Sequence, residues 1–171
     1  MRGMSYFGTV DIFIHIRILE LLDMLANGVI AGKYCTIDRN ELIGDNRVLG
    51  WNPVSVPLIR ERVNPNPIII IPFPIDRYSY VVIDGNHRVN YFLTTDESCI
   101  KATKLSPQTI AENGLFLSDF DKAVYALLVE VQALARLQSR QYLTAESNME
   151  LIQRTFPYTG HILTKWDVFP R

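Results

Sequence analysis

The sequence predicts an α+β fold, with a small mixed β-sheet, surrounding helices and a helical extension at the C-terminal end. Two runs, 68–73 and 78–83, have the β-branched and aromatic composition of buried strands. A longer apolar stripe between Phe120 and Leu137 has the spacing of an amphipathic helix. These segments together place a sheet in the middle of the chain and a long helix after it.

The N-terminal third predicts one helix and several short strands. Residues 9–27 combine alternating isoleucines with leucines at helical spacing, and the pattern stops at Asn27-Gly28. We expect a helix over most of this segment because its length exceeds that of an ordinary strand. The segments 34–37 and 47–51 are short apolar pieces, and glycine and asparagine predict a turn at 44–46.

The middle of the chain predicts two neighbouring strands. Prolines punctuate residues 53–67, where 56–63 fits one or two helical turns. The run 68–73 is β-branched and bounded by prolines, which favours a fully buried strand. A turn at 74–77 leads to the second strand at 78–83.

The remaining elements are mostly helical. We expect a helix at 86–93 with Asn86 as its N-cap, and a short strand at 98–103. Ser118 is the expected N-cap of the long helix to Leu137. A capping-box pattern predicts a shorter helix over 147–155, and the apolar end 156–171 is expected to fold back on the body.

Composition indicates a single domain with a sizeable core. The chain has 171 residues, is 48% hydrophobic and carries a formal net charge of −1. Because non-specific binding to duplex DNA needs a basic excess, the charge disfavours duplex DNA as a partner. Two cysteines, Cys35 and Cys99, are too few for a disulfide framework. Charged residues interrupt the apolar run 10–25, so we expect no membrane span, and with no secretory signal visible we expect a cytoplasmic protein.

The segment Asp84–Arg88, Asp-Gly-Asn-His-Arg, is the strongest candidate site. It stands between a predicted strand and a predicted helix, so a tight glycine turn would leave main-chain N–H groups without partners. Such N–H groups at a helix N-terminus bind anions, phosphate above all. Arg88 adds a guanidinium, and His87 can exchange a proton near neutral pH.

The order of motifs from Asn66 to Val89 resembles the ParB/sulfiredoxin superfamily. The matching pieces are Asn-Pro-Ile-Ile-Ile-Ile at 66–71 and Tyr-Val-Val-Ile-Asp-Gly-Asn-His-Arg-Val at 80–89, followed by a helix and a short strand. The resemblance covers about residues 50–105, which would form the core, and residues 117–171 would form the helical extension.

The branch that matches best is the one with Asp-Gly-His-His-Arg, which includes nucleotide-dependent free-serine kinases. Sulfiredoxins place a catalytic cysteine before the His-Arg pair, where this chain has Asn86, so sulfinic reductase chemistry is excluded. Partitioning ParB proteins carry a Gly-Glu-Arg-Arg box and a DNA-binding half that this chain is too short to match.

The resemblance implies a nucleotide (ATP, ADP or CTP) with Mg²⁺, or another small phosphorylated ligand. Gly85, Asn86, His87 and Arg88 would bind the phosphate, and His87, Asp84 and Glu61 would be the catalytic residues. Asp84 would hold the metal or a substrate hydroxyl, and Glu61 would act as the base. Glu61 also fits a solvated charge on a helix, Asp84 the first residue of a turn, and His87 a helix-start residue bonded to a loop carbonyl.

Three functions follow as hypotheses. The first is phosphate-ligand binding, with phosphotransferase or phosphohydrolase activity as its catalytic form. The second is a non-catalytic interaction module of phage or plasmid type, in which the helix from Ser118 to Leu137 supplies a homodimer or partner interface. The third is a ParB-like nuclease or DNA-partition-related protein, which the sequence favours least because it lacks an acidic metal cluster and a basic excess. On the first hypothesis, replacing Arg88 with alanine removes ligand binding and leaves stability little changed.

Overall fold

The computed structural model describes residues 2–5, 8–11, 13–44, 47–53, 65–75 and 78–138. Its elements are, in chain order, β1 (Arg2–Ser5), β2 (Gly8–Asp11), α1 (Ile18–Ala26), β3 (Lys33–Asp38), α2 (Arg39–Leu42), β4 (Leu49–Gly50), β5 (Ile68–Ile75), β6 (Tyr78–Asp84), α3 (Asn86–Phe92), β7 (Cys99–Lys104), α4 (Pro107–Glu112) and α5 (Asp119–Gln138). The chain divides into two compact units, residues 1–15 with 116–171 and residues 16–115. The expectation of a single domain stays a prediction.

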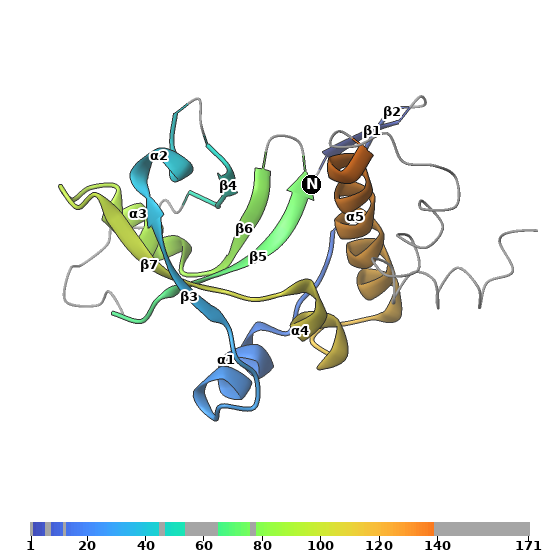
Figure 1. Cartoon of the computed structure of the whole chain (residues 1–171), viewed down its shortest axis with the longest axis horizontal. Coiled ribbons are helices and arrows are strands. Elements are labelled where there is room, and N and C mark those ends of the chain that lie inside the picture. The colour runs from blue at the N-terminus through green and yellow to red at the C-terminus, as the bar shows by residue number, and fades with distance from the viewer. Residues whose placement is uncertain are drawn as a thin grey trace, which may run out of the picture. The chain divides into compact units, whose positions relative to one another are not determined.

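The larger unit is built on a mixed sheet of five strands, which confirms the α+β class. The strand order is β3-β7-β5-β6-β4. β5 runs antiparallel to β6 and parallel to β7, while β3 runs antiparallel to β7. Figure 1 shows the strands between two groups of helices, with α2 above them and α1 and α4 below them in that view.

β5 continues past residue 73, where the strand was expected to end, so Pro74 and Ile75 belong to the strand and not to the turn predicted at 74–77. The strand extends to Ile75, with Pro72 opposite Tyr80 of β6. Its pairing with β7 extends only from Ile68 to Ile70, so Pro72 lies beyond the β7 ladder. Proline lacks an N–H group and is therefore tolerated in this half of the strand, although β5 lies inside the sheet.

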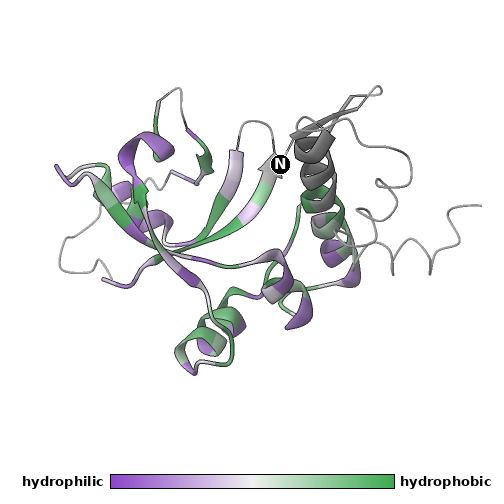
Figure 2. Cartoon of the chain, in the orientation of Figure 1, coloured by the Kyte–Doolittle hydropathy of each residue, from purple (hydrophilic) through white to green (hydrophobic). Residues whose placement is uncertain are grey.

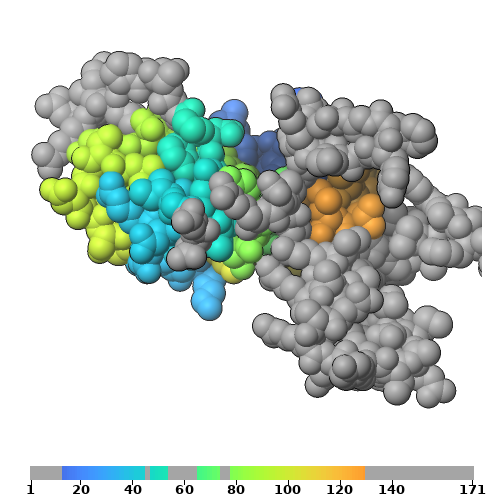
Figure 3. All heavy atoms as spheres, turned by 90° about the horizontal axis from the view of Figure 1, so that it is seen from above, coloured from blue at the N-terminus to red at the C-terminus, as the bar shows by residue number. Residues whose placement is uncertain are grey.

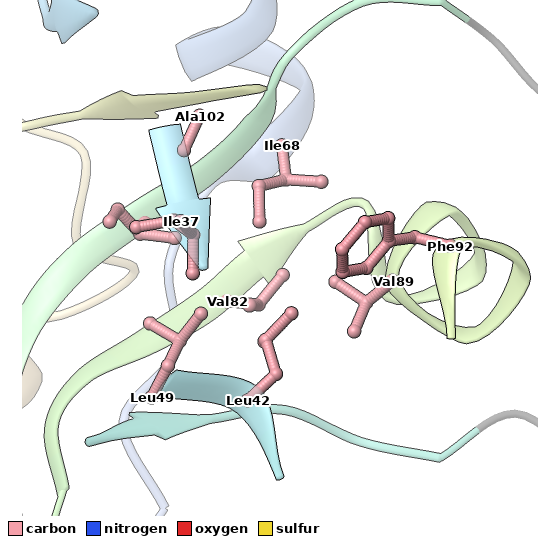
Figure 4. Close-up of a cluster of buried hydrophobic side chains, with 9 residues drawn as sticks. Ile37, Leu42, Leu49, Ile68, Val82, Val89, Phe92 and Ala102 are labelled. Carbon is pink, nitrogen blue, oxygen red and sulfur yellow. The ribbon is translucent and has the colours of Figure 1, made fainter. Parts of the chain in front are cut away.

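One face of this sheet carries a hydrophobic core that α2 and α3 cover. Figure 4 shows Val89 and Phe92 of α3 directed toward Ile68 and Val82 of the sheet. The core cluster contains Ile37, Leu42, Leu49, Ile68, Ile70, Val82, Val89, Phe92 and Ala102. Figure 2 shows the hydrophobic first half of β5 and the hydrophilic α2. Apolar burial on this face holds α3, and with it the segment Asp84–Arg88, against the sheet.

The predicted strands and helices of this unit are largely confirmed. The strands expected at 78–83 and 98–103 are β6 and β7, and the helix expected at 86–93 is α3. The helix expected over most of 9–27 is wrong in its first half, since β2 occupies 8–11 and α1 begins at Ile18. β2 contains none of the alternating isoleucines, and Ile14 and Ile16 lie in the segment between β2 and α1.

The smaller unit contains a two-stranded sheet, β1–β2, and α5. α5 confirms the long helix expected from Ser118, whose hydroxyl accepts a hydrogen bond from the main-chain N–H of Asp121 at 3.1 Å. The rings of Phe116 and Tyr125 lie 5.1 Å apart between centroids. Tyr125 is fully buried, and this burial raises the pKa of its phenol above the ordinary value of 10.0.

Asp121 joins α5 to the segment before α1 within this unit. The side chain of Asp121 is buried and accepts hydrogen bonds from the Ser118 hydroxyl and from the main-chain N–H of His15 at 2.9 Å. The ring Nδ1 of His15 lies 3.1 Å from the same carboxylate. These hydrogen bonds, that of Ser118 first, lower the pKa of Asp121 below its ordinary value of 3.8 and outweigh the opposing effect of burial.

Several predicted segments lie outside the described residues: the centre of the turn at 44–46, the helical turns at 56–63, the helix at 147–155 and the end 156–171. Within the described ranges, no helix combines the length and apolarity that crossing a membrane requires.

Candidate functional site

The candidate site is the corner where β6 passes into α3. β6 ends at Asp84, Gly85 forms the turn, and α3 starts at Asn86. Asp84 lies opposite Ile69 of β5, so the sheet register fixes where the turn begins. The strand, glycine turn and helix start predicted for 78–93 are confirmed in this order. The first N–H groups of a helix have no partner within the helix, so those at the start of α3 can donate hydrogen bonds to a ligand at the corner.

Gly85 is required at the corner for two separate reasons. Its φ angle is +101°, in the left-handed region that L side chains rarely adopt. A Cβ atom at this position would lie 2.7 Å from Cγ2 of Ile68 and 3.0 Å from Nη2 of Arg88. The turn can therefore be this tight only with glycine.

Asn86 is the first residue of the helix and not its N-cap, so that prediction is wrong. Gly85 occupies the N-cap position, and no side chain caps the helix. The side-chain oxygen of Asn86 instead accepts a hydrogen bond from the main-chain N–H of Asn52 at 2.9 Å. Asn86 thus ties the segment after β4 to the corner.

Arg88 is held inside the corner by three acceptors. Nη2 donates to Oδ2 of Asp84, and Nη1 donates to the carbonyl oxygens of Asn66 and Pro67. The Arg88 side chain is 11% exposed and that of Asp84 is 30% exposed. Since a guanidinium has five N–H groups, two remain for a ligand, and the other three join the start of β5 to the end of β6.

His87 is the exposed side chain of the corner. It makes no hydrogen bond or ion pair with any residue in the described part of the chain. Its position in the first turn of α3 places the imidazole beside main-chain N–H groups that have no partner within the helix. Among the predicted site residues, His87 is the one most available to a ligand.

The predicted metal and base residues are only partly described. Asp84 has one carboxylate oxygen bonded to Arg88, which leaves the other for a cation, and Mg²⁺ bound with a nucleotide often takes one or two carboxylates and the phosphates. The described residues contain no group of three or more histidine, cysteine, aspartate or glutamate side chains that could hold a metal ion alone. Glu61 lies outside the described residues.

Arg39 supports α3 from its other end, which sequence reasoning missed. The guanidinium donates to the carbonyl oxygens of Leu93 at 2.6 Å and Thr95 at 2.9 Å, and its central carbon lies 5.7 Å from the centroid of the Phe92 ring. The Asp-x-x-Glu spacing at 38–41, a capping-box pattern, could have revealed α2 and hence Arg39.

An open cleft of about 470 Å³ lies next to this support and is lined by Asp38, Arg39, Asn40 and residues 95–98. Figure 3 shows the α2 region beside the yellow-green segment around residue 95 at the surface. None of the predicted site residues lines this cleft. Arg39, which lines the cleft, already donates to the carbonyl oxygens of Leu93 and Thr95. We therefore do not count it among the ligand-binding residues of the candidate site.

No family model, no curated protein and no solved structure matches this chain.

Proposed function

We propose that the chain has a ParB/sulfiredoxin-like fold and binds a nucleotide or another phosphate-bearing ligand at the corner of Asp84, Gly85 and the start of α3. The observation that carries this proposal is the left-handed turn at Gly85 with an exposed His87 two residues later. The turn aims the N–H groups of Asn86, His87 and Arg88 in one direction, and a negatively charged group is stabilised by such donors.

Each side chain has a defined part in this proposal. His87 contacts the phosphate and exchanges a proton with it or with the acceptor. Arg88 fixes the turn through its three internal acceptors and offers its two remaining N–H groups to the phosphate oxygens. Asp84 contributes its second carboxylate oxygen to Mg²⁺ or to a substrate hydroxyl, and Glu61 is the proposed base.

The catalytic form of the proposal is phosphoryl transfer or phosphate-ester hydrolysis in the cytoplasm. Such a reaction fits the corner because positioning and electrostatic stabilisation carry most of its barrier. Loss of a single donor of this kind costs about 3 kcal/mol of transition-state stabilisation. The proposed acceptor is a hydroxyl group, as in the free-serine kinases that the sequence resembles.

A thermal-shift panel tests the binding proposal. The ligands are ATP, ADP, CTP, GTP and free serine, each with and without Mg²⁺. A ligand at about 100 times its Kd should add about 2.7 kcal/mol to the free energy of unfolding. His87→Ala should abolish the shift and leave the melting temperature of the free protein unchanged, since His87 is exposed.

Lys101→Ala is the control for the panel, because Lys101 is exposed on β7 and has no part in the corner. The proposal fails if none of these ligands raises the melting temperature, or if the shift is the same in wild type and His87→Ala.

A second candidate function is an interaction module that pairs through α5. Phe120 and Leu127 are seven residues apart on α5 and are 65% and 49% exposed. Large apolar side chains exposed on one helical stripe are typical of protein–protein contacts. Light scattering tests this candidate: a molar mass that stays monomeric at every concentration excludes it.

A further inference from the structure

A group of basic and aromatic side chains lies on the sheet, away from the corner. Lys104 at the end of β7 and Tyr80 on β6 are in contact: the ammonium nitrogen lies 3.9 Å from the centroid of the tyrosine ring and donates a hydrogen bond to its hydroxyl oxygen. β5 lies between these two strands, so the lysine side chain crosses over β5 to reach the tyrosine.

The strand register places further cations on the same face and the same end of the sheet. Lys33 of β3 is directly opposite Lys104, so their Cβ atoms are about 5 Å apart and point to one side. On the same face of β6, Tyr78 lies under the guanidinium of Arg47, whose central carbon is 4.7 Å from the ring centroid. Like charges placed directly opposite each other destabilise a sheet.

Among the described strand residues, no carboxylate at this end of the face balances the cations. The residues of β3, β5, β6 and β7 on this face include one acid, Asp84, which is four residues beyond Tyr80 and therefore about 13 Å away. Asp84 is itself bonded to Arg88. Among the described residues, neither Lys33 nor Lys104 forms a salt bridge.

The tyrosine hydroxyl adds a donor to these charges. Because the hydroxyl oxygen of Tyr80 accepts a hydrogen bond from Lys104, its own hydrogen points elsewhere, and it has no acceptor in the described part of the chain. A cation–π contact alone would need no ligand. A fixed ammonium, a free phenolic O–H and a second lysine on the same face of the sheet are the donor set of an anion site.

We infer that Lys104, Tyr80 and Lys33 form a binding site for a phosphate group, either free phosphate or a phosphate monoester. The Tyr80 hydroxyl and the Lys104 ammonium donate hydrogen bonds to the anion from β6 and β7. The ammonium group of Lys33 contacts the anion from β3. An anion here relieves the repulsion between the two lysines that the register sets opposite each other. The site is separate from the corner at Asp84–Arg88 and does not depend on the function proposed for it.

Differential acetylation of lysines in the full chain tests this inference. The protein is treated with an amine-acetylating reagent at constant ionic strength, with chloride replaced stepwise by inorganic phosphate or by glycerol phosphate, and each lysine is quantified by mass spectrometry. Phosphate should slow the acetylation of Lys104 and Lys33. Lys101 is the matched control, because it lies on β7 but on the opposite face of the sheet.

Protection by glycerol phosphate at lower concentration than inorganic phosphate identifies a monoester as the ligand, and equal protection identifies the phosphate group alone. Tyr80→Phe keeps the ring and removes the hydroxyl, so it should raise the concentration for half-protection of Lys104 about tenfold. His87→Ala should leave that concentration unchanged, which separates this site from the corner. The inference is overturned if phosphate protects Lys101 as strongly as Lys104, or if it does not protect Lys104 at all. It is also overturned if Tyr80→Phe leaves the concentration for half-protection of Lys104 unchanged.

Discussion

At the residue scale, the candidate site depends on contacts that no local pattern reveals. The pentapeptide at 84–88 predicts the turn and the helix start, because glycine between a strand and a helix has few other uses. The partners of Arg88 include two main-chain carbonyls about twenty residues earlier in the chain. Because every residue has a main-chain carbonyl, a sequence pattern cannot predict which ones accept these hydrogen bonds. Arg88, which was predicted to bind the phosphate, therefore also joins the start of β5 to the end of β6.

Gly85→Ala should lower the free energy of unfolding by about 3 kcal/mol, because the left-handed backbone costs about 1–2 kcal/mol and the new methyl group overlaps with Ile68. Urea denaturation followed by circular dichroism measures the loss. Gly28→Ala is the matched control: its φ is +68°, nothing lies within 4 Å of the added Cβ, and about 1 kcal/mol is expected. Equal losses in the two variants would show that the contact with Ile68 has no energetic weight.

Arg88→Ala should destabilise the protein by about 2–3 kcal/mol, since it leaves a half-buried carboxylate and two carbonyl oxygens without their donor. This prediction differs from the sequence-based expectation of little change in stability, because Arg88 is bonded to three acceptors within the protein. A double-mutant cycle with Asp84→Asn measures the pair: the two losses should not add, because each variant breaks the same ion pair. Additive losses would contradict the contact between the two side chains.

At the scale of elements, segments with a distinctive composition or period could be predicted and the shortest helices could not. β6, β7 and α5 were predicted within one or two residues, β6 from its β-branched and aromatic run and α5 from apolar residues at helical spacing. α2 and α4 contain only 4 and 6 residues, too few for periodicity to distinguish them from loops. Their signals are caps, such as Ser106, whose hydroxyl accepts a hydrogen bond from the N–H of Thr109.

Asp121→Asn should destabilise the start of α5 in a pH-dependent manner. The pKa of Asp121 is lower in the folded protein than the 3.8 of the unfolded chain, so its stabilisation is fully present above about pH 3.8 and is lost as the pH falls through the folded-state pKa. Urea denaturation of wild type and variant at about pH 6 and about pH 2 measures this. The difference between the two proteins should shrink at the lower pH, and a constant difference would contradict the lowered pKa.

At the scale of the whole molecule, the sheet order could not be read from the sequence. The β5–β6 hairpin is local and was expected, but β7 inserts beside β5 and β3 adds outside it. These pairings join residues about 30–70 positions apart, and which strand lies beside which depends on the burial of both faces. The coarse α+β class followed from composition and pattern alone.

A fragment of residues 16–115 should fold by itself. It contains all five strands of the larger sheet and the whole core cluster that α2 and α3 cover. We expect cooperative urea unfolding of the fragment by circular dichroism, with the same sensitivity to Gly85→Ala as in the full chain. A fragment without a cooperative transition would show that the smaller unit is needed for the sheet to form.

β3 forms the outer edge of the five-stranded sheet, and this position has a consequence for colloidal behaviour. An edge strand carries main-chain groups able to recruit a strand from a neighbouring molecule, which is the first step of amyloid-like stacking. Lys33 and Asp38 stand at its two ends, and charges at such positions act as gatekeepers against that stacking. Replacing both charged residues by neutral ones would therefore leave a six-residue edge strand with Tyr34 and Ile37 and no charge at either end. We expect such a variant to aggregate while its free energy of unfolding is still close to that of the wild type.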